Sequence, residues 1–223
     1  VEIEFACNLN EDHTGEFYLL QIRPIVDSKQ MLEENLSEID DDQCLLRSHN
    51  SLGHGIFDDV TDVVYVKYDD MFSAANNFVV ANDIERINDK FLGTGNKYVL
   101  IGRGRWGSSD PWLGVPIKWP NISAARVIVE VALQNYRVDP SQGTHFFQNL
   151  TSFGVGYFTI DTNRPGDGGL LRKSMLDSMP AIDETAYVRH VRFDNPLKIM
   201  MDGMKQEGVV IFDNQSGNET IKE

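Results

Sequence analysis

A segment rich in glycine and tryptophan, residues 98–119, constrains the possible folds of this chain more than any other part. A short apolar run at 98–101 predicts a buried strand, which leads into GRGRWG at 102–107, the spacing of a phosphate-binding glycine fingerprint. A dinucleotide site needs a helix directly behind the last glycine, so that the amide dipoles face the pyrophosphate. Pro111 and Pro116 leave no room for that helix, so we exclude a Rossmann site.

The loop that follows the predicted strand carries groups that match an anion. Arg103 and Arg105 supply guanidinium groups, and Ser108 and Ser109 supply adjacent hydroxyls. Arginine forks and backbone N–H groups both fit phosphate or carboxylate oxygens. The alternative is a structural turn, in which the arginines pair with acidic residues and the tryptophans fill the core. Both interpretations stay open at this point.

The charge of the chain restricts its partners. The 223 residues include 20 basic and 34 acidic side chains, a net charge of −14, which argues against a nucleic-acid surface because a phosphate backbone requires the opposite sign. No apolar run approaches membrane-spanning length and no signal peptide is evident, so we expect no membrane partner. Cys7 and Cys44 are far apart and predict reduced thiols in a cytoplasmic protein.

The first residues predict a β-hairpin. Residues 1–6 alternate apolar and acidic side chains, and residues 17–24 form a second β-rich run after a polar turn. Side chains two apart share a face, so Glu4 is expected to face Gln21 and Arg23 on the neighbouring strand. A carboxylate, an amide and a guanidinium on one face make a polar site, and the alternative is a solvated outer face.

The sequence IEF at 3–5 and YLLQIRP at 18–24 resembles the closing hairpin of the ATP-grasp nucleotide-binding domain in phosphoenolpyruvate synthase and pyruvate phosphate dikinase. The resemblance implies that Glu4 binds the magnesium of ATP, that Gln21 lies near the phosphates, and that Arg23 is a phosphate-side or structural neighbour. It also implies ATP and Mg²⁺ as cofactors of a complete polypeptide whose remaining ATP-grasp domain precedes this chain. The first residue, a valine within a strand pattern, predicts a fragment, and the hairpin alone is not expected to hold ATP tightly.

The remaining sequence predicts an α/β or α+β domain, with a mixed β-sheet and a few flanking helices. We divide the chain into the hairpin at 1–26, an acidic linker helix at 27–43, the main domain at 44–213 and a disordered tail at 214–223. The clearest helix is expected at 78–92, closed by a glycine. Strands are expected at 44–48, 62–67, 98–101, 115–119, 124–133, 155–160, 187–193, 197–201 and 209–212, and a second short helix at 170–179.

His145 is the candidate catalytic residue. Gly143 and Thr144 predict a helix entry, and a side chain in the first turn of a helix lies where exposed amides favour an anion. The triplet Gly143-Thr144-His145 resembles the phosphohistidine motif of the swivelling domain in phosphoenolpyruvate synthase, although the serine and alanine of that motif are missing. The alternative is a hydrogen-bonded structural histidine.

Two functions are consistent with these patterns. The leading hypothesis is the C-terminal part of a phosphoenolpyruvate-synthase-like phosphotransferase, which phosphorylates pyruvate or a related acceptor from ATP and is inactive as an isolated fragment. Its main domain would hold a phosphate or carboxylate of a small molecule. The other hypothesis is a non-catalytic regulatory or docking module attached to the ATP-grasp domain, because tryptophan and arginine are also favoured at interfaces.

Overall fold

The fold was described from a computed structural model of the chain. The structure describes residues 2–10, 14–23, 35–67, 73–110, 112–132, 146, 150, 153–162, 164 and 168–213. Within these residues the protein is mixed α+β, with one large curled mixed sheet and few helices, as the sequence predicts at that level. Predictions for the helix entry at 143–145 and for the tail at 214–223 lie outside the described residues.

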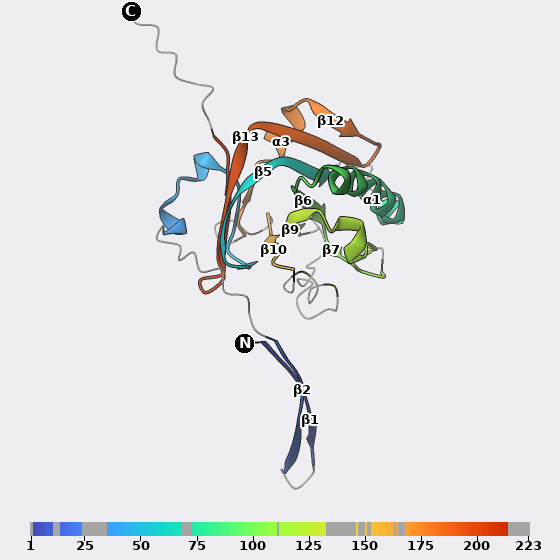
Figure 1. The fold of residues 1–223 in the computed structure, drawn as a ribbon, viewed down its shortest axis with the longest axis vertical. Helices are drawn as coiled ribbons and strands as arrows, with labels where there is room; N and C mark the ends of the chain where they lie inside the picture. Colours follow the sequence, from blue (N-terminus) through green and yellow to red (C-terminus); the bar gives the residue numbers. More distant parts are fainter. Residues whose placement is uncertain are drawn as a thin grey trace, which may run out of the picture.

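The predicted hairpin is confirmed. Strands β1 (Glu2–Leu9) and β2 (Gly15–Arg23) pair antiparallel and form a sheet of two strands. The hairpin stands away from the main sheet (Figure 1), and every hairpin side chain whose burial is described is exposed. The hairpin therefore takes its shape from its own cross-strand pairs and not from packing on the described part of the main domain.

In the described residues, the main domain is built on a 10-stranded sheet. Nine strands follow the order β11-β3-β14-β13-β5-β6-β9-β10-β4, and β12 pairs with the first residues of β13. Strands β5, β6, β9 and β10 run parallel to one another, and the other pairs are antiparallel. The strands are β3 (Cys44–Ser48), β4 (Ser51–Leu52), β5 (Gly55–Val66), β6 (Tyr98–Arg103), β9 (Ala125–Val131), β10 (Gly156–Ile160), β11 (Leu170–Leu171), β12 (Ala181–Glu184), β13 (Val188–Asp202) and β14 (Glu207–Ile211).

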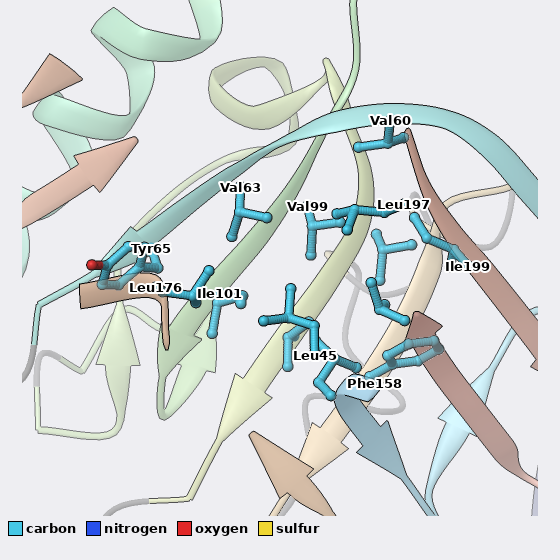
Figure 2. Packing of buried hydrophobic residues seen from close by; sticks show 14 of the residues in the cluster. Leu45, Val60, Val63, Tyr65, Val99, Ile101, Phe158, Leu176, Leu197 and Ile199 are labelled. Carbon is cyan, nitrogen blue, oxygen red and sulfur yellow. The ribbon is translucent and has the colours of Figure 1, made fainter. Parts of the chain in front are cut away.

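The sheet curls until its two ends meet, and the main core fills the space inside the curl. The Ser48 hydroxyl at the end of β3 donates to the Thr159 carbonyl of β10 at 2.7 Å, and the Ser51 amide of β4 donates to the Gln206 carbonyl at 2.9 Å. Figure 2 shows apolar side chains from β3, β5, β6, β10 and β13 pointing into this shared space. Buried residues include Leu45, Val63, Val99, Val129, Phe158, Leu197 and Ile199, all fully buried.

A second core lies on the outer face of the parallel strands, beneath helix α1 (Asn77–Thr94). The helix buries Val80, Ile84, Ile87 and Phe91, which recur at helical spacing and form the predicted stripe. It ends at Gly95, whose φ of 77° is left-handed, two residues later than the predicted glycine. Short elements complete the fold: η1 (Leu36–Glu38), η2 (Asp41–Gln43), η3 (Ala74–Asn76), β7 (Arg105–Trp106), β8 (Gly114–Val115), η4 (Trp119–Ile122) and α3 (Lys173–Ser178).

Several predicted elements differ from the structure. The strand expected at 115–119 is wrong beyond Val115, because the chain turns there and enters η4. The strands expected at 187–193 and 197–201 are one strand, β13, which continues through a bulge that includes Pro196. The two residues at 170–171 form strand β11 before the short helix α3 begins.

The acidic segment before β3 does not form the expected helix in its described part, 35–43. It makes two 3-10 turns, and Leu36 is 1% exposed in a small core with Cys44 and Met200. Arg47 holds these turns, since its guanidinium donates to the Leu36 carbonyl at 2.8 Å and to the Asp41 carboxylate at 2.6 Å. Packing and these bonds therefore order a segment whose composition resembles a solvated linker. The division of the chain at Cys44 stays a prediction.

Candidate functional site

The polar face of the hairpin brings two predicted site residues together. Glu4 and Gln21 are direct Cα partners across β1 and β2, and both are exposed. Glu2 and Arg23 are Cα partners two residues further along the ladder, beyond the pair Ile3 and Ile22. Directly opposite residues in an antiparallel pair have their side chains on the same face, so the Glu4 carboxylate and the Gln21 amide lie side by side.

The register of the hairpin changes beside this pair. Glu4 faces Gln21 whereas Phe5 faces Leu19, so one residue of β2 is bulged out. A bulge bends the bulged strand and often re-aims side chains near a site. It also keeps Glu4 and Gln21 on the polar face and leaves the apolar side chains on the other.

The donor set on this face fits a magnesium ion that also binds phosphates. Mg²⁺ takes hard oxygen ligands, usually one or two carboxylates with phosphate and water oxygens, and Glu4 and Gln21 offer a carboxylate and an amide oxygen. Among the described residues, no three His, Cys, Asp or Glu side chains gather as a metal site. The hairpin therefore offers part of a coordination sphere and not a complete one.

A second candidate site lies at the carboxyl edge of the four parallel strands. Arg103 is the last residue of β6 and the Cα partner of Val131, the last residue of β9. Two residues after Arg103, Arg105 begins β7, which pairs parallel with β8. Ligands of α/β sheets commonly bind outside the carboxyl ends of parallel strands, and helix α1 also begins near this edge, after the end of β5. The topology thus gathers the glycine loop at the edge where a ligand is expected.

The glycines of this loop have structural reasons. A Cβ at Gly102 would lie 2.0 Å from the indole ring of Trp106, and one at Gly104, whose φ is +72°, would lie 2.5 Å from the Leu113 carbonyl. The Trp106 ring is 2% exposed, and its Nε1 donates to the Val129 carbonyl at 3.0 Å. The fingerprint spacing therefore follows from packing Trp106 against β6. As we expected, no helix follows the last glycine, since residues 107–113 form turns in their described part.

Glu130 is a polar residue at this edge whose role the sequence did not reveal. We interpreted it as pointing away from the neighbouring valines and as either a surface acid or an arginine partner. It does point away, but it is 5% exposed: Oε1 accepts from the Trp106 amide at 2.9 Å and Oε2 accepts from the Tyr157 hydroxyl at 2.5 Å. The signal that could have found it is a single acid inside a β-branched run, which predicts a strand covered on both faces.

The paired serines have different surroundings. The Ser108 hydroxyl donates to the Asp110 carbonyl at 2.9 Å and accepts from the Asp110 amide, while Ser109 is exposed. The Asp110 carboxylate accepts from the Trp112 amide at 2.9 Å. Ser108 therefore helps to form the turn, and Ser109 is the hydroxyl that this loop presents to solvent.

The candidate catalytic residue, His145, lies outside the described residues. A different histidine lies in a buried polar cluster: the His190 Nε2 is 2.6 Å from the Asp62 carboxylate on the neighbouring strand, and Arg192 and Thr61 also donate to that carboxylate. Burial alone would raise the pKa of Asp62, but the hydrogen bonds from His190, Thr61 and Arg192 lower it further than burial raises it. His190 is thus a cross-strand partner, as its position in an alternating strand predicts.

Comparison with known proteins does not identify a family. No family model, no curated protein and no solved structure matches the chain. Within the described part of the chain, none of the helices combines the length and the apolar character that crossing a membrane requires.

Proposed function

We propose that this chain is the C-terminal part of a phosphoenolpyruvate-synthase-like phosphotransferase of the cytoplasm, which transfers a phosphoryl group from ATP to pyruvate or a related small acceptor. The observation that carries the proposal is the direct pairing of Glu4 with Gln21 on the exposed polar face of the hairpin. The same two residues bear the resemblance to the closing hairpin of an ATP-grasp domain. The rest of that domain, in the same polypeptide, is the partner that would complete the nucleotide site.

In this proposal the hairpin residues bind and orient the nucleotide. The Glu4 carboxylate would hold the magnesium ion, which neutralises phosphate charge when bound, and the Gln21 amide would contact the phosphates. Arg23 extends the same strand on the phosphate side. These contacts fix the triphosphate in place, and phosphoryl transfer depends mainly on positioning and on electrostatic stabilisation.

The main domain would hold the phosphate or carboxylate of the acceptor at the carboxyl edge of the parallel strands. Arg103 and Arg105 supply the positive charge there, Ser109 supplies an exposed hydroxyl and Ser108 shapes the turn. Trp106 and Glu130 hold the loop in one conformation. The Arg103 and Arg105 side chains therefore extend from a backbone that is held in place. Fixed cations stabilise an anion without reorganising as charge develops.

Calorimetric titration of the chain with inorganic phosphate, phosphoenolpyruvate and pyruvate tests the main-domain site. We expect saturable heat with at least one of these anions, and an affinity at least about tenfold lower in Arg105→Ala. Arg126→Ala is the matched control, because Arg126 pairs with Asp59 at 2.8 Å at the opposite end of β9. Equal losses in both variants, or unchanged binding in Arg105→Ala, contradict the site.

The hairpin site is tested by phosphoryl transfer from ATP in the polypeptide that also carries the nucleotide-binding domain. Glu4→Gln removes the carboxylate and keeps the shape, so we expect at least an approximately hundredfold lower rate. Glu16→Gln is the control, since Glu16 lies on the same polar face beside Asn8, at the other end of the ribbon. A Glu4→Gln enzyme with the wild-type rate would contradict the assigned role.

One observation favours the second candidate, a non-catalytic docking or regulatory module. The conformation of the glycine loop is explained by Gly102 packing on Trp106 and by the Glu130 hydrogen bond, without any ligand. A module of this kind produces no heat with any of the three anions. The same titration therefore separates the two candidates.

A further inference from the structure

The segment that follows the glycines presents one tryptophan to solvent. Trp112 is 74% exposed, whereas Trp106 is 2% exposed and Trp119 is partly buried and stacks on Phe153 with ring centroids 5.0 Å apart. A single exposed apolar side chain is ordinary on a protein surface. Trp112 differs from such a residue in how its backbone is held and in which side chains lie near it.

Hydrogen bonds fix the backbone of Trp112. Its amide donates to the Asp110 carboxylate at 2.9 Å, and the next amide, that of Leu113, donates to the Asp110 carbonyl at 3.0 Å. The Leu113 carbonyl accepts from the Arg105 amide at 2.8 Å. The exposed indole therefore extends from a short turn that is tied to the arginine segment, so a ligand need not order this backbone when it binds.

Trp112 lies close to the two arginines of the glycine loop. Arg105 and Gly114 are Cα partners on neighbouring strands, which lie about 4.8 Å apart. Trp112 is two residues before Gly114, so its Cα is within about 12 Å of the Arg105 Cα. Arg103 is two residues before Arg105, and the exposed Ser109 belongs to the same turn as Trp112. One small ligand can therefore reach both the indole and the guanidinium groups.

The chemistry of these groups defines a class of ligand. Guanidinium groups match the oxygens of a phosphate or carboxylate, and the face of an indole stacks on a flat ring. We infer that the anion site of the glycine loop takes a ligand whose phosphate or carboxylate is joined to a planar ring, with Trp112 stacked on that ring. The inference rests on the proposed function for its anion site, and it adds the part of the ligand that the arginines do not recognise.

Calorimetric titration of the whole chain with phenylphosphonate and with methylphosphonate tests the ring contact, because the two anions share the phosphonate and differ in the ring. From the typical strength of aromatic stacking, we expect phenylphosphonate to bind at least about fivefold more tightly. Trp112→Ala should remove this preference and leave the methylphosphonate affinity unchanged, and Trp112→Phe should retain part of it. Phe17→Ala, which removes an exposed ring from the hairpin, is the matched control and should change neither affinity.

The outcomes separate this inference from the proposed anion site. If both phosphonates bind equally, or if the preference survives in Trp112→Ala, the ring contact is overturned while the anion site stands. Binding of neither anion contradicts both. A phenylphosphonate affinity that is unchanged in Arg105→Ala also overturns the inference, because the ring would then bind without its anionic group at the arginines.

Quenching of tryptophan fluorescence by acrylamide gives a second test, which requires no variant. Acrylamide reaches the exposed Trp112 and not the buried Trp106. Saturating phenylphosphonate should reduce the quenching, whereas saturating methylphosphonate should leave it unchanged. Equal quenching with the two anions would mean that the ring of the ligand does not cover the indole, and this result overturns the inference.

Discussion

Phe5 in the hairpin and Phe158 in the large sheet both lie in strands with alternating side chains, yet Phe5 is 53% exposed and Phe158 is 0% exposed. The difference comes from what covers each strand. Strand β10 is packed inside the curl on one face and beneath the outer core on the other, whereas β1 has one partner strand and no covering layer in the described residues. The comparison teaches that the alternation pattern indicates which side chains share a face but not whether that face is covered.

The largest effect on stability is expected from removing the Phe158 ring, and the comparison is with removal of the Phe5 ring. Phe158→Ala leaves a cavity inside the curl and should lower the free energy of unfolding by about 3–5 kcal/mol. Phe5→Ala removes the same group from an exposed ribbon and should change the unfolding of the sheet by less than about 0.5 kcal/mol. Urea denaturation followed by tryptophan fluorescence reports the main domain and not the hairpin, because all three tryptophans lie at 106–119. Similar losses in both variants would show that the hairpin and sheet unfold as one unit.

A smaller effect is expected from the buried carboxylate of β5. Asp62→Asn leaves His190 and Arg192 without their anionic partner, so we expect the free energy of unfolding to fall by about 3 kcal/mol, less than for an isolated buried pair because Arg192 is partly exposed. Glu16→Gln in the hairpin is the control, since its exposed carboxylate accepts a hydrogen bond from Tyr18 on the same strand. Wild-type stability in Asp62→Asn would mean that the cluster contributes nothing net to the sheet.

The smallest effect concerns acid stability. Hydrogen bonds from Arg86 at 2.8 Å and Lys90 at 2.6 Å hold the pKa of Asp183 on β12 well below its usual range. A carboxyl with a lowered folded-state pKa stabilises the protein above its unfolded pKa of about 4, and this contribution is lost as the pH falls through the folded value.

Asp183→Asn should therefore lower stability at pH 7 by about 1 kcal/mol, a value reduced by the exposure of Arg86 and Lys90, and should flatten the decline below pH 4. Thermal unfolding at pH 7 and at pH 3 measures both effects. Asp59→Asn is the control and should change stability less, because the Asp59 carboxylate, which pairs with Arg126, is more exposed than that of Asp183. An unchanged pH dependence in Asp183→Asn would assign the acid sensitivity to other carboxylates.

Regular spacing of apolar side chains along the sequence predicted one helix and several strands correctly. The stripe of Val80, Ile84, Ile87 and Phe91 predicted α1, and the β-branched run at 124–133 predicted β9. A strand was expected at 115–119, but after Val115 the chain enters a turn and then η4. The failures occur where neighbours in space, rather than in sequence, decide the conformation.

The candidate site shows the same limit. The sequence predicted that Glu4 faces Gln21, because a hairpin with a short turn allows few pairing registers between its two strands. It did not reveal that Glu130 lies within 3 Å of both Trp106 and Tyr157, since these residues come from three separate segments. Whether the arginines of the glycine loop bind an anion depends on that assembled edge and stays a prediction.

The amino-acid sequence by itself determined the hairpin, its polar and apolar faces, the helix α1 and the exclusion of a Rossmann helix behind Gly107, because these follow from side-chain periodicity and from proline geometry. Only the tertiary structure decided that the sheet curls until β3 meets β10, that Glu130 and Asp62 are buried with partners, and that the acidic turns at 35–43 pack on β3. Burial depends on which distant strand covers a face, and contacts between distant segments leave no periodic signal in the chain.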